Sequence, residues 1–109
     1  MNEIKIPFDP LMAWCSIEGH KVCTSRNKKY GKPGDTFQVK FDDETHRFIL
    51  IHIEKRPLWF VKHNLYQLEG FTAPEGFEKI WRKLHPRKGY DPNHEVWVHW
   101  YCPLNREEA

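Results

Sequence analysis

The sequence lacks long apolar runs. Within its 109 residues no hydrophobic segment approaches the roughly 20 residues that a membrane-spanning helix needs. The opening residues, MNEIK, also lack the apolar stretch of a signal peptide. We therefore expect a cytoplasmic protein with no membrane contact, and we take a monomer as the default state.

Metal-binding patterns are missing as well. The three cysteines form no CxxC pair, so the sequence indicates neither a disulfide framework nor a zinc ribbon. Of the seven histidines, His85, His94 and His99 lie closest to the last predicted strand, but their spacing matches neither HExxH nor HxH. We predict no metal and no other cofactor.

An excess of one charge is also absent. Lys and Arg total 17 against 15 Asp and Glu, and a net charge of +2 is too small to predict nucleic-acid binding by itself. The chain does contain 39% hydrophobic, 15% aromatic and 29% charged residues, a composition typical of a folded protein. Its length fits one core, so we expect a single domain over residues 1–109.

Turn residues and hydrophobic periodicity divide the chain into helices and strands. The predicted helices lie between Asp9 and Gly19, between Pro57 and Gly70, and between Thr72 and Pro86. The predicted strands cover residues 21–26, 36–41, 48–53 and 96–101. The strands are too few and the connections too short for a doubly wound parallel sheet. We therefore predict an α+β fold, a small and partly closed β-barrel of about five strands flanked by three helices.

Two of the helices carry specific local predictions. In the first, Asp9 is placed to cap the N-terminus, and the spacing of Leu11, Trp14 and Cys15 predicts that they face the core. In the last, Thr72 and Glu75 are three positions apart, as a capping box requires. Its predicted buried stripe consists of Phe77, Ile80, Trp81 and Leu84.

Three segments carry a resemblance to a known family. Residues 19–26 read GHKVCTSR, residues 30–35 read YGKPGD, and residues 69–71 read EGF ahead of the helix that contains Trp81. Over almost the whole chain these motifs resemble the ASCH family, named for activating signal cointegrator homology. The resemblance implies a PUA-like fold, a small β-barrel with helices around a cleft, and a role in handling RNA or nucleosides.

The resemblance also implies a candidate catalytic group. Some small bacterial ASCH proteins remove the acetyl group from acetylated cytidine with a lysine, a threonine and a glutamate, which fall here on Lys21, Thr24 and Glu69. Thr24 would then be the nucleophile, Lys21 the base and Glu69 a proton relay. Residues 21 and 24 point to opposite faces of a regular strand. The pair therefore converges only if Lys21 lies in the turn before the strand or its long side chain bends back.

The chemistry of these residues leaves the function open. A lysine acts as a base only after losing its proton, and a neighbouring carboxylate such as Glu69 favours the ammonium form. The structural alternative is a solvated Lys21 at a helix–strand junction and an ordinary strand threonine at position 24. Our first hypothesis is therefore a domain that binds RNA or a nucleotide between residues 21–26 and Glu69. The alternatives are an amidohydrolase and a protein-interaction module.

A basic and aromatic cluster supports the binding hypothesis. Arg26, Lys28, Lys29, Tyr30 and Lys32 follow one another around a glycine-containing loop. Cations of this kind attract a phosphate backbone, and an aromatic face stacks on an unpaired base. We predict that these residues bind the ligand.

Two further features are candidates for ligand binding. Trp59 falls outside any periodic stripe, which indicates either a base-stacking platform or a lid over the core. A second basic cluster lies along the last helix and the loop beyond it, and its alternative is a solvated helix face. This cluster consists of Lys79, Arg82, Lys83, Arg87 and Lys88.

Overall fold

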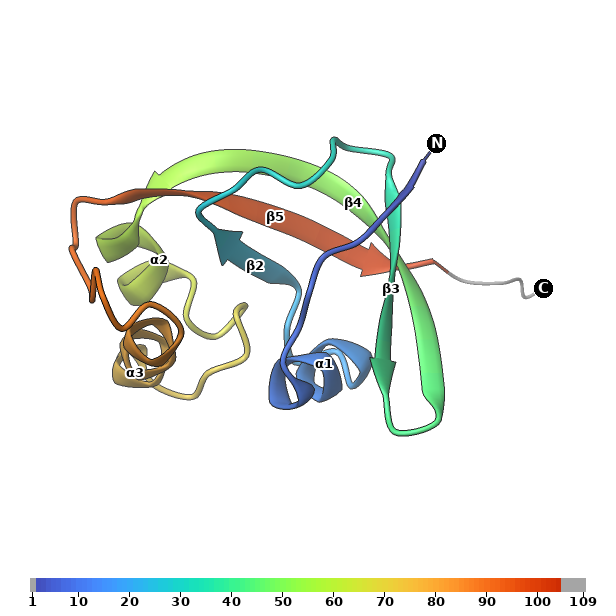
Figure 1. Cartoon of the computed structure of the whole chain (residues 1–109), viewed down its shortest axis with the longest axis horizontal. Coiled ribbons are helices and arrows are strands. Elements are labelled where there is room, and N and C mark those ends of the chain that lie inside the picture. Colours follow the sequence, from blue (N-terminus) through green and yellow to red (C-terminus); the bar gives the residue numbers. More distant parts are fainter. Residues whose placement is uncertain (1, 105–109) are drawn as a thin grey trace.

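A curved, mixed sheet with helices beneath it forms the framework of the molecule (Figure 1). The computed structural model describes residues 2–104. The strands are β1 (Glu3–Ile4), β2 (Cys23–Arg26), β3 (Thr36–Phe41), β4 (Glu44–Pro57) and β5 (Glu95–Pro103). The helices are α1 (Pro10–Ile17), α2 (Leu58–Asn64) and α3 (Pro74–Leu84). The predicted α+β class, with five strands and three helices, is confirmed.

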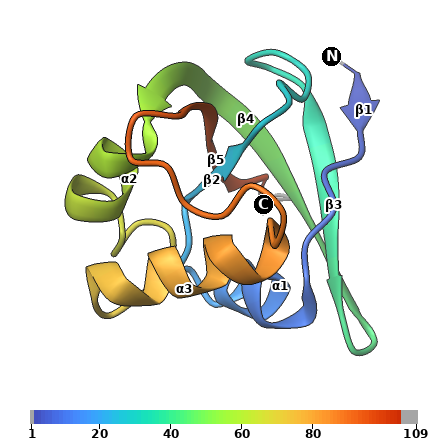
Figure 2. The same cartoon turned by 60° about the vertical axis from the view of Figure 1, so that its left-hand side comes forward.

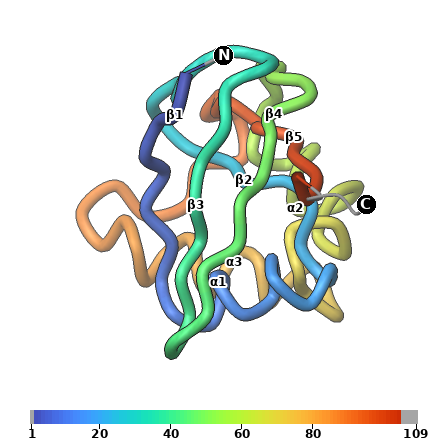
Figure 3. Tube along the Cα trace, turned by 90° about the vertical axis from the view of Figure 1, so that its right-hand side faces the viewer, coloured from blue at the N-terminus to red at the C-terminus, as the bar shows by residue number. Residues whose placement is uncertain are grey.

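The strand order is β1-β3-β4-β5-β2, with β1 parallel to β3 and the other pairs antiparallel. Figure 3 shows β1, β3 and β4 side by side. Among the described residues β1 and β2 pair with no further strand, so the sheet is curved but not closed. The sequence did not predict β1, because its two residues are too few to produce a periodic pattern.

A bulge in β4 lets one strand serve both halves of the sheet. β4 spans 14 residues, well beyond the predicted 48–53, and pairs with β3 along its first part and with β5 along its second. The register to β5 shifts between Leu50 and His52, which leaves Ile51 unpaired and exposed. Bulges of this kind increase local twist and bend a strand. The apolar run was therefore a poor guide to the ends of this strand.

Two hydrophobic clusters pack against the two halves of the sheet. Figure 2 shows α1 and α3 on the same side of the curved sheet. The cluster under α1 contains Ile6, Ala13, Phe37, Val39, Phe48, Leu50 and Tyr101. The cluster under α2 and α3 contains Cys23, Leu58, Val61, Leu65, Phe77, Trp81, Val96 and Val98. β2 lies at one edge of the sheet, and its Cys23 belongs to the cluster under α2 and α3.

The start of α1 agrees with the sequence, but only one of the three residues predicted to face the core, Cys15, is buried. Asp9 caps the helix by accepting a 2.9 Å hydrogen bond from the Met12 amide. Leu11 and Trp14 are 56% and 39% exposed, whereas Met12, Ala13, Cys15 and Ser16 are buried. The inward face includes a serine because Ser16 shares a 2.7 Å hydrogen bond with the buried Tyr101 hydroxyl. A hydrophobic pattern assigns such a serine to solvent.

The boundaries of the other helices also differ from the prediction. The N-cap of α3 is Ala73, and no side chain caps it, so the expected capping box of Thr72 and Glu75 is absent. Pro74 at the first helical position has no amide hydrogen to leave unpaired, and its fixed φ suits a helix start. Phe77 and Trp81 are buried as predicted, Ile80 is half-buried, and Leu84 is exposed.

The early end of α2 determines where Glu69 lies. The helix stops at Asn64 instead of continuing to Gly70, and Leu65 is its C-cap. Residues 65–70 then form a turn that exposes Leu68 and buries Glu69. Within residues 2–104 no helix combines the length and apolar character needed to cross a membrane.

Candidate functional site

A cavity of about 490 Å³ lies between β2, the segment before α1, and α3. Its polar lining includes Lys21, Thr24 and Arg26 from the segment around β2 and Glu69 from the turn after α2. Asp9, Asn27, Lys28 and His85 line it too. Much of the remaining wall is aromatic. The aromatic residues are Phe8, Tyr30, Phe71, Phe77 and Trp81. The cavity thus combines stacking surfaces with a few convergent polar groups, as ligand sites do.

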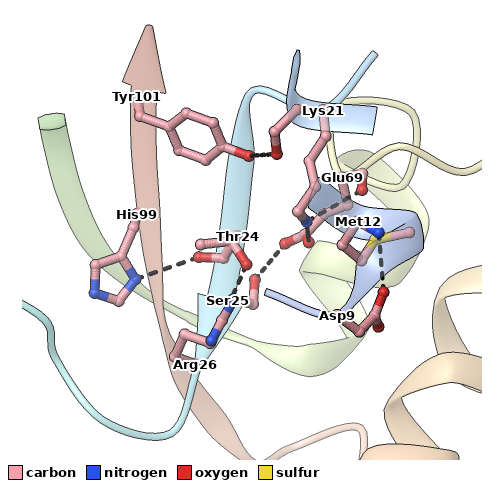
Figure 4. Close-up of polar contacts among 10 residues, drawn as sticks. Asp9, Met12, Lys21, Thr24, Ser25, Arg26, Glu69, His99 and Tyr101 are labelled. Atoms are coloured by element: carbon pink, nitrogen blue, oxygen red, sulfur yellow. Dashed lines mark hydrogen bonds and ion pairs between the residues drawn. The ribbon is translucent and has the colours of Figure 1, made fainter. Parts of the chain in front are cut away.

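Lys21 and Glu69 form a buried ion pair in this cavity (Figure 4). The Lys21 Nζ atom lies 2.8 Å from Glu69 Oε1 and also donates to the Glu69 main-chain carbonyl at 3.2 Å. Ser25 Oγ donates to the other carboxylate oxygen, Oε2, at 2.6 Å. Both side chains of the pair are 3% exposed. The carboxylate is therefore held at both oxygens, and its orientation is fixed.

The turn after α1 sets the position of Lys21. The residue precedes β2 and its amide donates to the Cys15 carbonyl at 3.1 Å, so it lies outside the regular strand. Strand alternation therefore does not apply to Lys21, and its side chain is free to converge with that of Thr24. The structural alternative of a solvated Lys21 is wrong, since the residue is only 3% exposed.

The turn after α2 places Glu69 opposite Lys21. The Val22 and Cys23 amides both donate to the Leu68 carbonyl, at 2.8 and 3.3 Å, which ties this turn to β2. Gly70 follows with a φ of +102°, and a Cβ atom there would lie 3.4 Å from Lys21 Cβ. Glycine suits this position because it tolerates positive φ. The Glu-Gly pair of the sequence motif thus has a physical reason.

Arg26 and Thr24 make the second polar group. Arg26 Nε donates to Thr24 Oγ1 at 3.1 Å, and the guanidinium carbon lies 5.1 Å from the centre of the Phe8 ring. Burial lowers the pKa of Arg26, but a guanidinium remains charged under any physiological condition. Because the threonine oxygen accepts this bond, its own hydroxyl proton is left for a ligand or a base.

His99 supports this group from behind. The side chain is fully buried, and its Nε2 accepts a 2.9 Å bond from the Tyr30 amide, so the proton lies on Nδ1. Nδ1 then donates to the Thr24 carbonyl at 3.3 Å. Burial lowers the pKa of His99, which keeps the ring neutral at pH 7. His99 therefore positions the loop that carries Tyr30 against β2.

The cavity does not contain every predicted ligand-binding residue. Besides the polar group, Lys28 and Tyr30 line it, with the Lys28 ammonium 5.2 Å from the centre of the Tyr30 ring. Lys29 instead lies 5.2 Å from the Trp97 ring, on the other side of the loop. Lys32 pairs with Asp35, its Nζ 3.5 Å from Oδ1, at the turn before β3.

The remaining predicted surface features also lie outside this cavity. Trp59 is exposed on α2 and packs edge-on against Phe60, with ring centres 5.8 Å apart. The residues of the basic cluster on α3 do not line the cavity, and Arg82 pairs with Glu78 at 2.7 Å. Among residues 2–104, no group of three or more His, Cys, Asp or Glu side chains is arranged to hold a metal ion.

Sequence reasoning missed two contributors. Ser25 follows Thr24 on β2, and its contact with Glu69 could not be anticipated without the path of residues 65–70. Phe8 lies in the segment before α1, which carries no periodic signal, yet its ring lies under Arg26. A cation–aromatic pair between distant residues leaves no local pattern in a sequence.

Comparison with known proteins shows what this framework resembles. No family model matches the sequence, and no curated protein matches it. An ASCH domain from Lactobacillus crispatus superposes with a TM-score of 0.73 and 10% identity, over 94% of this chain and 78% of that chain. The protein has the fold of an ASCH domain. The ASCH-type fold implied by the sequence motifs is thereby confirmed.

Two further solved structures agree. A protein from Enterococcus faecalis of family DUF984 gives a TM-score of 0.68 at 13% identity, over 94% of this chain and 75% of that chain. A mutant ASCH protein from Zymomonas mobilis gives a TM-score of 0.64 at 14% identity, over 95% of this chain and 76% of that chain. At these identities the likeness concerns the fold, and function must be argued from the cavity.

Proposed function

We propose that this protein binds a nucleoside, free or as a residue of single-stranded RNA, in the cavity beside β2. The observation that carries the proposal is that Lys21, Thr24, Arg26 and Glu69 converge in one cavity with aromatic walls. Its volume of about 490 Å³ falls within the range of about 300–1,000 Å³ that is usual for small-molecule sites.

The polar groups suit the edge of a base. A cytosine edge presents an amine beside ring and carbonyl acceptors, and the Glu69 carboxylate beside the Lys21 ammonium is a complementary pair of acceptor and donor. Each carboxylate oxygen already accepts one bond, from Lys21 or from Ser25, and retains a further lone pair for an amine. The fixed carboxylate supports recognition of an exocyclic amine.

The aromatic walls and the cations suit the rest of a nucleoside in RNA. Proteins recognise unstacked bases by stacking them on aromatic side chains or on arginine. Phe71, Phe77 and Trp81 contribute aromatic surface to the cavity wall, and Lys28 lies at the loop where a backbone phosphate would be attracted. This arrangement supports a single-stranded ligand.

A titration tests the proposal. Cytidine, uridine, adenosine and a short unpaired RNA are added while calorimetry and tryptophan fluorescence are followed, because Trp81 lines the cavity. We expect saturable binding that Thr24→Val weakens about tenfold, since the loss of a buried hydrogen bond leaves a partner unpaired. Thr45→Val, an exposed threonine of β4, is the matched control and should leave affinity unchanged. Absence of saturable binding to every ligand by the folded protein would overturn the proposal.

A second candidate function is hydrolysis of an acylated nucleoside. It is favoured by one observation, that the cavity contains all three residue types assigned by the family resemblance, Lys21, Thr24 and Glu69. The Thr24 oxygen would attack the acyl carbon, the carbon–nitrogen bond would break, and the leaving amine would take up a proton. Water would then cleave the threonyl ester and release the acid. The ion pair requires Lys21 to pass its proton to Glu69 before it can act as a base.

Turnover distinguishes the two candidates. Acetylated cytidine is incubated with the protein at high concentration, and free cytidine is measured. If hydrolysis occurs, Thr24→Val should abolish it and Thr45→Val should not. If the wild-type protein releases no cytidine, the second candidate is discarded and the binding proposal stands on the titration alone.

The cavity gives no support to the protein-interaction alternative. That alternative expects a cleft filled by the protein's own side chains. The cleft beside β2 instead has an open volume of about 490 Å³. A ligand smaller than a protein is the better match to this space.

A further inference from the structure

A second and smaller cavity, of about 160 Å³, adjoins the first. The two share three lining residues, Asn27, Trp81 and His85, so they border each other. The other residues that line it come from α2 and from the loop after α3. They are Leu58, Lys88, Gly89, Asp91 and His94.

We propose that this second cavity holds a phosphoryl group attached to the nucleoside in the first. The proposal rests on the proposed function and narrows its ligand class. The ligand is then a nucleotide, or a residue within an RNA strand, in preference to a free nucleoside.

The size of the second cavity fits a phosphoryl group. Its 160 Å³ is about a third of the larger cavity, too little for a second nucleoside. A water molecule takes up about 30 Å³ in the liquid, so the space holds a tetrahedral group of a few heavy atoms together with hydrating water. Phosphoryl groups in polar sites retain water of this kind.

The lining of the second cavity includes hydrogen-bond donors for an anion. His94 Nε2 lies 2.6 Å from Asn27 Oδ1, so this contact uses the amide oxygen of Asn27 and leaves its two N–H donors for a ligand. Lys88 is exposed and adds an ammonium at the rim. Among residues 2–104 no ion pair involves Lys88 or Lys28, so neither cation is neutralised by a described carboxylate.

Two negatively charged features oppose the binding of an anion in this cavity. Hydrogen bonds from neighbouring groups reduce the effect of both. Asp91 is the one carboxylate among the described lining residues, and its Oδ1 accepts a 3.0 Å bond from the Asn93 amide. The C-terminus of α3 carries a partial negative charge. The Trp81 carbonyl at this end already accepts from both the amide and the Nδ1 of His85, at 2.9 and 3.0 Å. Lys88 then supplies the attracting charge at the rim of this cavity.

Matched ligands with and without a phosphate test this inference. The affinities of cytidine, its 5′- and 3′-monophosphates and a cytidylyl-uridine dinucleotide are measured at low salt. We expect at least one monophosphate to bind about tenfold more tightly than cytidine, the gain of one charge-assisted contact. The dinucleotide arm shows whether a bridging phosphate is accepted as well as a terminal one.

Charge-removing variants locate the phosphate. Lys88→Gln should abolish the gain in affinity that the phosphate provides and leave the affinity for cytidine unchanged. The matched control is Lys79→Gln, an exposed lysine of α3 that lines neither cavity and should retain the gain. Unchanged cytidine binding by both variants verifies that the larger cavity remains intact.

The possible failures are distinguishable. If neither cytidine nor any phosphorylated ligand binds, the proposed function fails together with the inference. If cytidine binds and phosphates add nothing, the inference alone is overturned. A gain that survives Lys88→Gln but disappears in Lys28→Gln would place the phosphate at the rim of the larger cavity and would also overturn it.

Discussion

Two lysine–glutamate ion pairs in this molecule have similar geometry and different surroundings. Lys21 and Glu69 lie 2.8 Å apart with both side chains 3% exposed, and they join the turns that follow α1 and α2. Lys62 and Glu78 lie 2.6 Å apart at 17% and 21% exposure, and they join α2 to α3. Arg82 adds a 2.7 Å contact to Glu78, so the outer pair belongs to a small surface network.

The difference between the pairs indicates what each contributes. Removing two charges from water costs several kcal/mol per ion, and a buried pair is often replaceable by apolar residues without loss of stability. Stability alone therefore does not require the inner pair. Since it lies in a cavity and its carboxylate is held at both oxygens, we interpret it as a binding group. The outer pair makes a modest contribution to the packing of two helices.

Breaking the inner pair should have the largest effect. Lys21→Met leaves the Glu69 carboxylate buried and unpaired, which should lower the free energy of unfolding by about 3–5 kcal/mol. Replacing both residues, with Lys21→Met and Glu69→Leu, should restore most of that loss and abolish nucleoside binding. Urea unfolding and calorimetry measure the two effects. A double variant that binds the nucleoside as well as the wild type would contradict our interpretation of the pair.

Disturbing the turn behind the inner pair should have an intermediate effect. Gly70→Ala places a side chain at a φ of +102°, where an alanine backbone is strained, so it should cost about 1–2 kcal/mol and displace the neighbouring Glu69. Gly19→Ala is the matched control, because Gly19 also has a positive φ but a Cβ there meets nothing within 4 Å. Both variants should lose stability, and only Gly70→Ala should lose affinity for the ligand. Equal affinities would show that the backbone conformation of the turn at Gly70 is unimportant for binding.

Acid should weaken the inner region through His99. Because burial lowers the pKa of His99 in the folded state, the unfolded chain binds a proton that the folded one excludes as the pH falls below about 6.5. This contribution to stability is complete above pH 6.5 and is lost below it, by up to about 1.4 kcal/mol per pH unit.

The histidine contribution is separable from that of other groups. His99→Gln should be less stable at pH 7.5 but should show a smaller loss between pH 7.5 and 5.5. Urea denaturation at the two values measures the slope for each protein. Identical slopes in the variant and the wild type would exclude His99 as the source.

Removing the outer pair should have the smallest effect. The Lys62 ammonium, through its hydrogen bond, holds the pKa of Glu78 below its ordinary value, but both groups are close to solvent. Glu78→Gln should therefore shift the Tm by no more than a few degrees and leave ligand affinity unchanged. Differential scanning calorimetry measures the Tm, and a titration measures the ligand affinity. A loss of stability as large as that caused by Lys21→Met would show that the two ion pairs do not differ in their contribution.

The sequence anticipated the framework better than its details. Strand 36–41 and the Asp9 cap were predicted correctly because alternation and capping are local signals. The inward face of α1 was not, because Ser16 is buried through a bond to a residue 85 positions away. The break of α2 at Leu65, which buries Glu69, likewise depends on tertiary packing.

The candidate site also contains residues that the sequence predicted and residues that it did not. The motif residues Lys21, Thr24 and Glu69 come to one cavity, and Lys21 lies in the turn after α1, one of the two arrangements that strand geometry allows for convergence. Lys29 and Lys32 lie outside it, because proximity along a loop does not fix the direction of long side chains. Ser25 joins the site through a contact that no spacing rule reveals.

The most direct test of the central claim is a nuclear magnetic resonance titration of the labelled protein with cytidine. We predict that the amide signals of Lys21, Thr24, Arg26 and Glu69 shift together and saturate, while those of Lys62 and Glu78 stay in place. Shifts confined to other surfaces, or no shifts at saturating nucleoside, would contradict the claim that the buried ion pair belongs to a nucleoside site.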